Sequence, residues 1–468
     1  MTLLIVILLI LGYLLIATGH MTGVNKAAIA MFIGTVGWVV YICWGSDFVM
    51  SQHPHEYAEF LSGQSPSSHA VKAYIYDNVF LWYVGRAASI VMFLLATMSI
   101  IEILENNGCF DFIQEWIHTR NSKRVLWTLS LATFLISANL DNLTTTAMML
   151  VMMHQIVRSR AQRMLVGASI VLAANCGGCF TVIGDPTGLV LWGDGAVTAT
   201  RFSMRLFLPA ALAWIIPTLL ISRQLPGRLD VEWTAPPYRG DDTNLNRWQR
   251  LVMLFVGIGG LWFTPTFHNL TNLSPFLGAL CVLSVLWVVN EAFNRRLNES
   301  DQMAARRVPR SIEYGTIQQM LFVMGIMLGM GVMTETGVFG DISAWIDYNV
   351  HNVWIVGIFS GLLSSVVDTF TIAITNISLY PVVENSGLDR WADSDYLRNF
   401  TQNGTYWSVI AFATAVGGCL LSVGSTSGLA LMKMEHVRLG WYLKNLTPKV
   451  LLGLAVGFLV LWLESFVF

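Results

Sequence analysis

The sequence predicts an all-α integral membrane protein built from two inverted-topology repeats, each with a re-entrant hairpin and a broken transmembrane helix. The 468 residues are 54% hydrophobic and only 12% charged, and the mean hydropathy is +0.58. A soluble protein carries about 25% charged residues. Apolar segments of transmembrane length recur along the chain, and three motifs occur twice in the same order. The net charge of -2 gives no basis for binding nucleic acid.

Eight apolar segments approach the length of about 20 residues that crosses a bilayer as a helix. The first has no basic residue before it and no small-residue cleavage pattern after it, so we expect a retained helix rather than a signal peptide. The chain should therefore cross the lipid bilayer many times. The segments lie at residues 3–18, 27–45, 79–104, 204–222, 250–263, 275–293, 315–334 and 447–468.

The lysines and arginines predict the orientation. If the loop at 46–78 lies outside, 21 of the 27 basic residues lie on the cytoplasmic side, as the positive-inside rule requires. The N-terminus is then outside, and the apolar zones 125–157 and 354–383 must each enter and leave the membrane on one side. We therefore expect two re-entrant hairpins, with Asp141 and Asp368 near their tips.

The repeated motifs divide the chain. They predict two related units at 79–222 and 315–468. We expect N-terminal helices and an outer loop at 1–78, and a cytoplasmic linker with two connecting helices at 223–314. The units begin with helices of opposite direction, the inverted arrangement in which secondary transporters bind substrate and ion near the midplane. Residues 108–117, 137–144 and 177–188 recur at 337–346, 364–371 and 417–428.

Polar residues interrupt the apolar zones. The string from Ser137 to Thr146 places a carboxylate, two amides and several hydroxyls between apolar flanks. An ionisable residue inside a membrane span costs about 2.5–3.5 kcal/mol on insertion scales and usually has a function. A buried Asp that only fixes packing is the alternative, and the recurrence of the motif argues against it.

Two further strings are expected to break helices. Gly184-Asp185-Pro186 does so because proline removes a backbone donor and clashes with the preceding turn, and the glycines at 424 and 428 can act similarly. Unwound backbone at membrane depth must line a cavity or be buried in protein. Its oxygens, with those of the side chains, suit a hard cation. The candidate cation-binding residues are Asp141, Asn142, Thr144, Asn175, Asp185, Thr187, Asp368, Thr369, Ser425 and Thr426.

The three aspartates of this set are the candidates for proton coupling. Ionised carboxylates repel each other, and either a cation or a proton relieves that repulsion. Cations and protons should therefore compete for Asp141, Asp185 and Asp368, which is a mechanism of exchange that requires no cofactor.

Other polar groups receive simpler interpretations. The six cysteines are scattered and form no disulfide framework, and the CxxC spacing of Cys176 and Cys179 is expected to reflect close packing. A metal site in the outer loop has few supporting ligands. We expect solvation of His53, His55, His69, Glu102, Glu105 and Glu335, which lie in that loop or near helix ends.

The motifs resemble those of the NhaD-type sodium/proton antiporters of the ion transporter superfamily. The resemblance rests on the string at 137–146, Ala173 to Gly178, Ile183 to Thr187, Val367 to Thr369, and the glycine block at 417–428 with Met434-Glu435 after it. It implies electrogenic exchange of sodium or lithium for protons in a bacterial inner membrane, by a homodimer with an elevator mechanism. We expect Asp141, Asn142 and Asp368 to bind the sodium or lithium ion. The full functional set that the resemblance implies is Asp141, Asn142, Asn175, Asp185, Thr187, Asp368, Thr369 and Ser425.

One departure from the family pattern concerns the ion. Pro186-Thr187-Gly188 stands where a run of threonines is expected, so one hydroxyl ligand is missing. Two alternatives stay open. A superfamily relative could carry a carboxylate or arsenite, although aspartates at the tips would repel an anion. An intramembrane aspartyl protease would use two aspartates, but Val182 replaces the first glycine of its Gly-x-Gly-Asp string.

Overall fold

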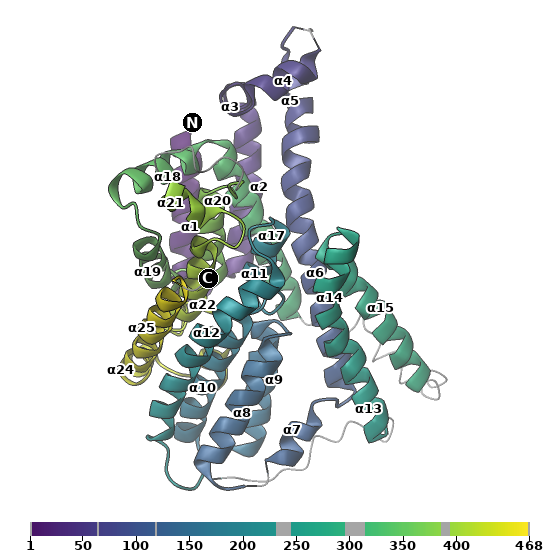
Figure 1. The fold of residues 1–468 in the computed structure, drawn as a ribbon, viewed down its shortest axis with the longest axis vertical. Coiled ribbons are helices and arrows are strands. Elements are labelled where there is room, and N and C mark those ends of the chain that lie inside the picture. The colour runs from purple at the N-terminus through teal and green to yellow at the C-terminus, as the bar shows by residue number, and fades with distance from the viewer. Residues whose placement is uncertain are drawn as a thin grey trace.

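The protein is helical throughout the described part of the chain. A computed structural model describes residues 2–62, 65–117, 119–230, 245–294, 314–384 and 394–466, and in these ranges it contains two isolated β-bridges and no longer strand. Much of the predicted linker, at 231–244 and 295–313, and part of the outer loop, at 385–393, lie outside the described residues. The arrangement of the helices is shown in Figure 1.

Eight helical segments of the described chain are long and apolar enough to cross a membrane, which confirms the predicted all-α membrane fold. One of them combines α5 (Ser68–Tyr74), η1 (Ile75–Phe80) and α6 (Leu81–Asn106), and another combines α13 (Arg247–Leu254), η2 (Phe255–Gly259) and α14 (Gly260–Thr271). The others are α1 (Thr2–Thr22), α2 (Lys26–Cys43), α12 (Ala199–Ser222), α15 (Pro275–Phe293), α17 (Tyr314–Glu335) and α25 (Thr447–Glu464).

Two pairs of shorter helices form the hairpins. The first pair is α8 (Ser122–Ser137) with α9 (Asn142–Ile156), and the second is α19 (Val353–Ser364) with α20 (Thr369–Leu379). Each helix has 11 to 16 residues, fewer than the roughly 20 that span a bilayer. The turn of each pair brings the chain to an aspartate, which caps the second helix.

Two other helices are interrupted near the hairpin tips. The chain leaves α10 (Arg160–Cys179), passes through an irregular segment and continues as α11 (Pro186–Gly193). In the second half it leaves α22 (Thr405–Gly417) and continues as α23 (Thr426–Glu435). Pro186 is the first residue of α11, a position where proline needs no amide hydrogen.

The hairpins contact these interrupted helices through equivalent hydrogen bonds. Ser137 Oγ donates to the carbonyl of Ala174 at 2.7 Å, and Ser364 Oγ donates to the carbonyl of Thr414 at 2.8 Å. The serines are 227 residues apart and the carbonyls 240, the same offsets as in the repeated motifs. These contacts support two related units, whose boundaries and opposite orientation remain predictions.

Glycines bring the same helices close together. A Cβ on Gly177 would lie 2.3 Å from the carbonyl oxygen of Phe134, and a Cβ on Gly417 would lie 2.3 Å from that of Gly361. Both glycines therefore allow an interrupted helix to approach the backbone of a hairpin. The close fit fixes the hairpin tips relative to the helix breaks.

The remaining long helices surround this set. Helices α2 and α17 pack together, and Gly325 permits close contact because a Cβ there would lie 2.4 Å from the backbone carbon of Ala30. Helices α13 to α15 lie along α6 at one side of the molecule, and α25 packs on α12 at another (Figure 1). Short helices α3 (Gly45–Gln52) and α4 (Pro54–Leu61) cover the end of the molecule near α5.

Candidate functional site

Asp141 lies at the tip of the first hairpin as the N-cap of α9. Its Oδ2 accepts the backbone N–H groups of Leu143 and Thr144, both at 3.1 Å, and the Thr144 hydroxyl at 3.4 Å. Its Oδ1 accepts the side-chain amide of Gln319 on α17 at 2.9 Å. The residue is 2% exposed. Its hydrogen-bond donors in the described part of the chain are all neutral groups.

Asp185 is the N-cap of α11 and faces the first hairpin. Its Oδ1 accepts the N–H of Thr187 at 2.9 Å, and its Oδ2 accepts the Asn142 side-chain amide at 3.1 Å. Asn142 also lies 3.4 Å from the amide oxygen of Asn175 on α10. All four residues are buried. The structure therefore brings together four of the predicted residues, from α9, α10 and the break before α11.

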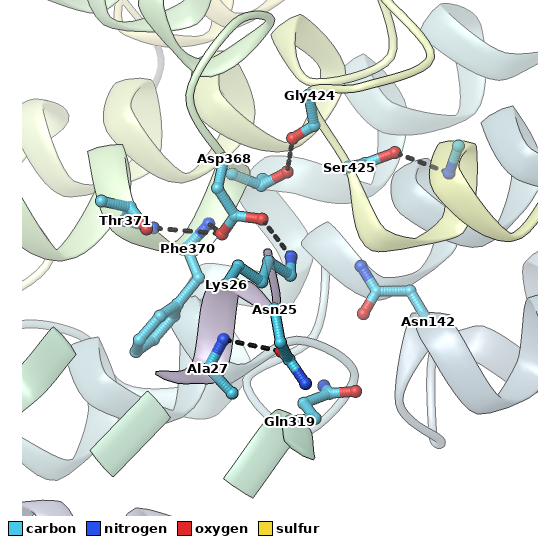
Figure 2. Close-up of polar contacts among 12 residues, drawn as sticks. Asn25, Lys26, Ala27, Asn142, Gln319, Asp368, Phe370, Thr371, Gly424 and Ser425 are labelled. Carbon is cyan, nitrogen blue, oxygen red and sulfur yellow. Dashed lines mark hydrogen bonds and ion pairs between the residues drawn. The ribbon is translucent and has the colours of Figure 1, made fainter. Parts of the chain in front are cut away.

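Asp368 occupies the matching position in the second hairpin, as the N-cap of α20. Its Oδ2 accepts the N–H groups of Phe370 and Thr371 at 3.2 and 3.4 Å. Its Oδ1 forms an ion pair with Lys26, the first residue of α2, at 2.7 Å. Figure 2 shows the lysine side chain reaching the hairpin tip, with Gln319 and Asn142 nearby.

The break before α23 contributes residues of the second repeated unit to the site. Ser425 caps α23 by accepting the N–H of Gly428 at 3.0 Å, and Thr369 donates its hydroxyl to the carbonyl of Gly424 at 3.0 Å. Thr426 is only half-buried, whereas the Ser427 hydroxyl donates to the carbonyl of Asn142 at 3.2 Å. One contact between the two halves thus involves Ser427, one position beyond the predicted Thr426.

The carboxylates lie close enough to influence one another. Asp185 interacts electrostatically with both Asp141 and Asp368. Lys26 offsets the charge of Asp368 through the ion pair. A further cation or proton near Asp141 and Asp185 would relieve the repulsion between them.

Several oxygens around the aspartates have no hydrogen-bond partner among the described residues. They are the hydroxyls of Thr187 and Thr371 and the side-chain carbonyl of Gln319, and all three atoms are buried. A buried polar group without a partner costs about 1–3 kcal/mol. Hydroxyl and carbonyl oxygens are ligands that hard cations prefer. The chemistry of the site therefore suits a hard cation.

The sequence-based prediction missed Lys26 and Gln319. Lys26 lies between the apolar segments 3–18 and 27–45, where a basic residue satisfies the positive-inside rule without any partner. Gln319 follows Gln318 as a polar pair at the start of the apolar segment 315–334, and this pair is the signal that could have identified it. Both residues come from the helix pair α2 and α17, and each contacts the aspartate of one hairpin.

A second buried polar group lies away from this site. The expectation that Glu335 is solvated is wrong: it is 6% exposed, at the end of α17. His53 Nε2 and the Tyr83 hydroxyl each lie 2.8 Å from its carboxylate, and His53 Nδ1 lies 3.0 Å from Glu56. The hydrogen bond with Glu335 raises the pKa of His53 above its usual value of 6.5. The described residues contain no group of three or more His, Cys, Asp or Glu side chains placed to hold one metal ion.

The CxxC cysteines lie inside the protein. Cys176 and Cys179 lie in the last turn of α10, are both buried, and are free thiols. This placement agrees with the packing interpretation.

The fold and the buried polar site are those of a multi-pass membrane transporter. A family model described as citrate transporter matches residues 2–389, and the chain belongs to this family. Sodium/proton antiporter 1 of Arabidopsis thaliana is 31% identical over 373 residues, which cover 80% of this chain and 61% of that protein. Sodium/proton antiporter 2 of the same plant is 29% identical over 375 residues, covering 80% of this chain and 84% of that protein.

The chain is also similar to a bacterial antiporter. The Na(+)/H(+) antiporter NhaD of Vibrio cholerae is 28% identical over 396 residues, covering 79% of this chain and 77% of that protein. These relatives confirm the resemblance to NhaD-type antiporters that the motifs predicted.

Proposed function

We propose that this protein exchanges sodium or lithium ions for protons across the inner membrane of a bacterium, with its N-terminus outside. The observation that carries the proposal is the cluster of buried carboxylates Asp141, Asp185 and Asp368 among amide and hydroxyl oxygens. A cation and a proton each neutralise such a cluster, so loading one favours release of the other. The names of the relatives support the same exchange.

The hydrogen bonds also support an elevator movement. Ser137 and Ser364 tie the hairpins to α10 and α22, and Ser427 ties α23 to the first hairpin. These elements form one connected set. Lys26 and Gln319 lie on α2 and α17, outside that set, and contact its two tips. In the proposed mechanism the set moves against the other helices of a homodimer and carries the ion with it.

A carboxylate is the second candidate substrate, because the family model bears the description of citrate transporters. Anions bind at helix N-termini through free backbone N–H groups. Here the N-termini of α9, α11 and α20 already donate to Asp141, Asp185 and Asp368. An incoming anion would meet these negative charges instead of free donors, so the geometry favours a cation.

Exchange is tested in everted membrane vesicles from a host that lacks its own sodium/proton antiporters. The vesicles are energised to acidify their interior, and a fluorescent dye follows the pH gradient at several alkaline pH values. Sodium, lithium, potassium or citrate is then added. The proposal predicts that sodium or lithium collapses the gradient and that Asp141→Asn abolishes the response. A response to citrate with none to any cation would contradict it and favour the carboxylate carrier.

A further inference from the structure

An ion pair connects the second hairpin to a helix that lies outside it. Lys26 Nζ lies 2.7 Å from Asp368 Oδ1, and the two side chains are 22% and 5% exposed. The residues are 342 positions apart in the sequence. Figure 2 shows that the lysine side chain spans the space between the start of α2 and the start of α20.

The ion pair occupies the part of Asp368 that the helix cap leaves free. Oδ2 already accepts the N–H groups of Phe370 and Thr371, and Oδ1 faces the Lys26 ammonium. The ammonium also lies 4.6 Å from the centre of the Phe322 ring, which favours a cation at this position. Both oxygens of Asp368 are therefore engaged while the ion pair is present.

The first hairpin differs at the corresponding point. Asp141 Oδ1 accepts a neutral amide from Gln319, not a charged group. An amide can turn its oxygen toward an ion, and the Gln319 carbonyl oxygen has no hydrogen-bond partner among the described residues. A lysine offers only donors. The two tips thus have unequal access to a cation.

We propose that Lys26 occupies the place of a cation at Asp368 and competes with the transported ion for this carboxylate. This inference rests on the proposed cation exchange. An ammonium and a sodium ion carry the same charge, and two like charges a few ångströms apart in a buried site repel strongly. Binding of the ion at Asp368 therefore requires that Lys26 move away.

The competition would link ion binding to movement. The ion pair attaches α20 to α2, which lies outside the set of hairpins and interrupted helices. When an ion displaces Lys26, this attachment is lost and the hairpin tip is free to move with its ion. Lys26 is thus a positioning residue, which acts through Asp368.

Transport kinetics of Lys26 variants test the competition. In Lys26→Gln, the sodium KM should fall about tenfold, a change of about 1.4 kcal/mol, because the competing charge is gone. Lys26→Arg keeps the charge and should retain a KM near the wild-type value. Lys72→Gln, which removes an exposed lysine, is the matched control and should leave the KM unchanged. An unchanged or higher sodium KM in Lys26→Gln would overturn the inference, whether or not the turnover rate also falls.

A second measurement uses the wild-type protein and so does not depend on the folding of a variant. The purified protein is treated with an amine-reactive reagent in sodium chloride or in choline chloride at equal ionic strength, and mass spectrometry follows each lysine. Sodium should increase modification of Lys26 several-fold and leave Lys72 unchanged. If the protein transports sodium but modification of Lys26 does not increase, the competition between Lys26 and the ion is refuted and the proposed function stands. Absence of sodium transport in the wild type would instead refute the proposed function.

Discussion

Asn142 donates a hydrogen bond of 3.1 Å to Asp185 and thereby joins the tip of the first hairpin to the break between α10 and α11. The same amide group lies near Asn175, so it orients two potential oxygen ligands. Its backbone carbonyl accepts the Ser427 hydroxyl from the second half. Asn142 thus lies where the hairpin and both interrupted helices meet.

Replacing Asn142 with leucine tests this junction. The variant keeps a similar branched shape but leaves Oδ2 of Asp185 without its amide donor and removes an amide from the proposed ion site. We expect the sodium KM to rise about tenfold, equivalent to about 1.4 kcal/mol. Asn139→Leu is the control, because Asn139 lies in the same turn but its side chain donates to the carbonyl of Leu135 and accepts from the Trp262 indole. Equal effects of the two substitutions on KM would contradict a specific role for Asn142.

The Thr187 hydroxyl is predicted to be an ion ligand. It is buried without a hydrogen-bond partner among the described residues and adjoins the Asp185 cap. Thr187→Val removes the oxygen and preserves the shape, so we expect weaker sodium affinity with little change in thermal stability. Thr264→Val on α14 is matched in burial and also lacks a described partner. The Thr264→Val control should have the sodium affinity of the wild type. Both affinities are measured by transport at increasing sodium concentration.

Gly177 should be sensitive to the smallest substitution. In Gly177→Ala the new methyl group would lie 2.3 Å from the Phe134 carbonyl oxygen, so α8 and α10 must separate. Overpacking of this kind costs about 1–3 kcal/mol, and we expect a lower unfolding temperature in detergent. A Cβ on Gly193 meets nothing within 4 Å. If Gly177→Ala unfolds at the same temperature as Gly193→Ala or a higher one, the contact between Gly177 and Phe134 is not tight.

The pair of His53 and Glu335 predicts a pH-dependent contribution to stability. The hydrogen bond raises the pKa of His53 in the folded protein. The protonated histidine therefore stabilises the fold fully below its unfolded pKa of about 6.5, and this contribution is lost as pH rises through the higher folded pKa.

His53→Gln should consequently lower the unfolding temperature at pH 5.5 and have little effect at pH 9. His55→Gln serves as the control because His55 is an exposed neighbour in α4. An equal loss of stability in His53→Gln at both pH values would show that the charge of the histidine contributes nothing.

The sequence predicted the membrane segments and most of the site because both leave local signals. Runs of apolar residues indicate helices, and polar strings within them, such as those around Asp141 and Asp185, are costly enough to be informative. Helix caps are local as well, since Asp141 and Asp368 accept N–H groups only two and three residues ahead. Because the motif of the first hairpin recurs in the second half of the sequence, the second hairpin could be predicted as well.

The contacts between distant helices could not be predicted in this way. Lys26 and Asp368 have no periodic relation, and a lysine in a short inner loop satisfies the positive-inside rule without any partner. Glu335 near a helix end can likewise reach water, unless a loop covers it as the segment around His53 does. Ser427 rather than Thr426 contacts Asn142 because the cap by Ser425 sets the rotation of α23.

The most direct test of the central claim uses the purified protein in liposomes with an imposed proton gradient, acidic inside, and radioactive sodium outside. The account predicts that sodium accumulates against its own gradient as protons leave, and that Asp141→Asn and Asp368→Asn, although folded, abolish accumulation. Accumulation that persists in both variants would contradict the assignment of the site. Uptake of labelled citrate when the gradient is reversed, acidic outside, with no uptake of sodium under either gradient, would contradict cation exchange itself.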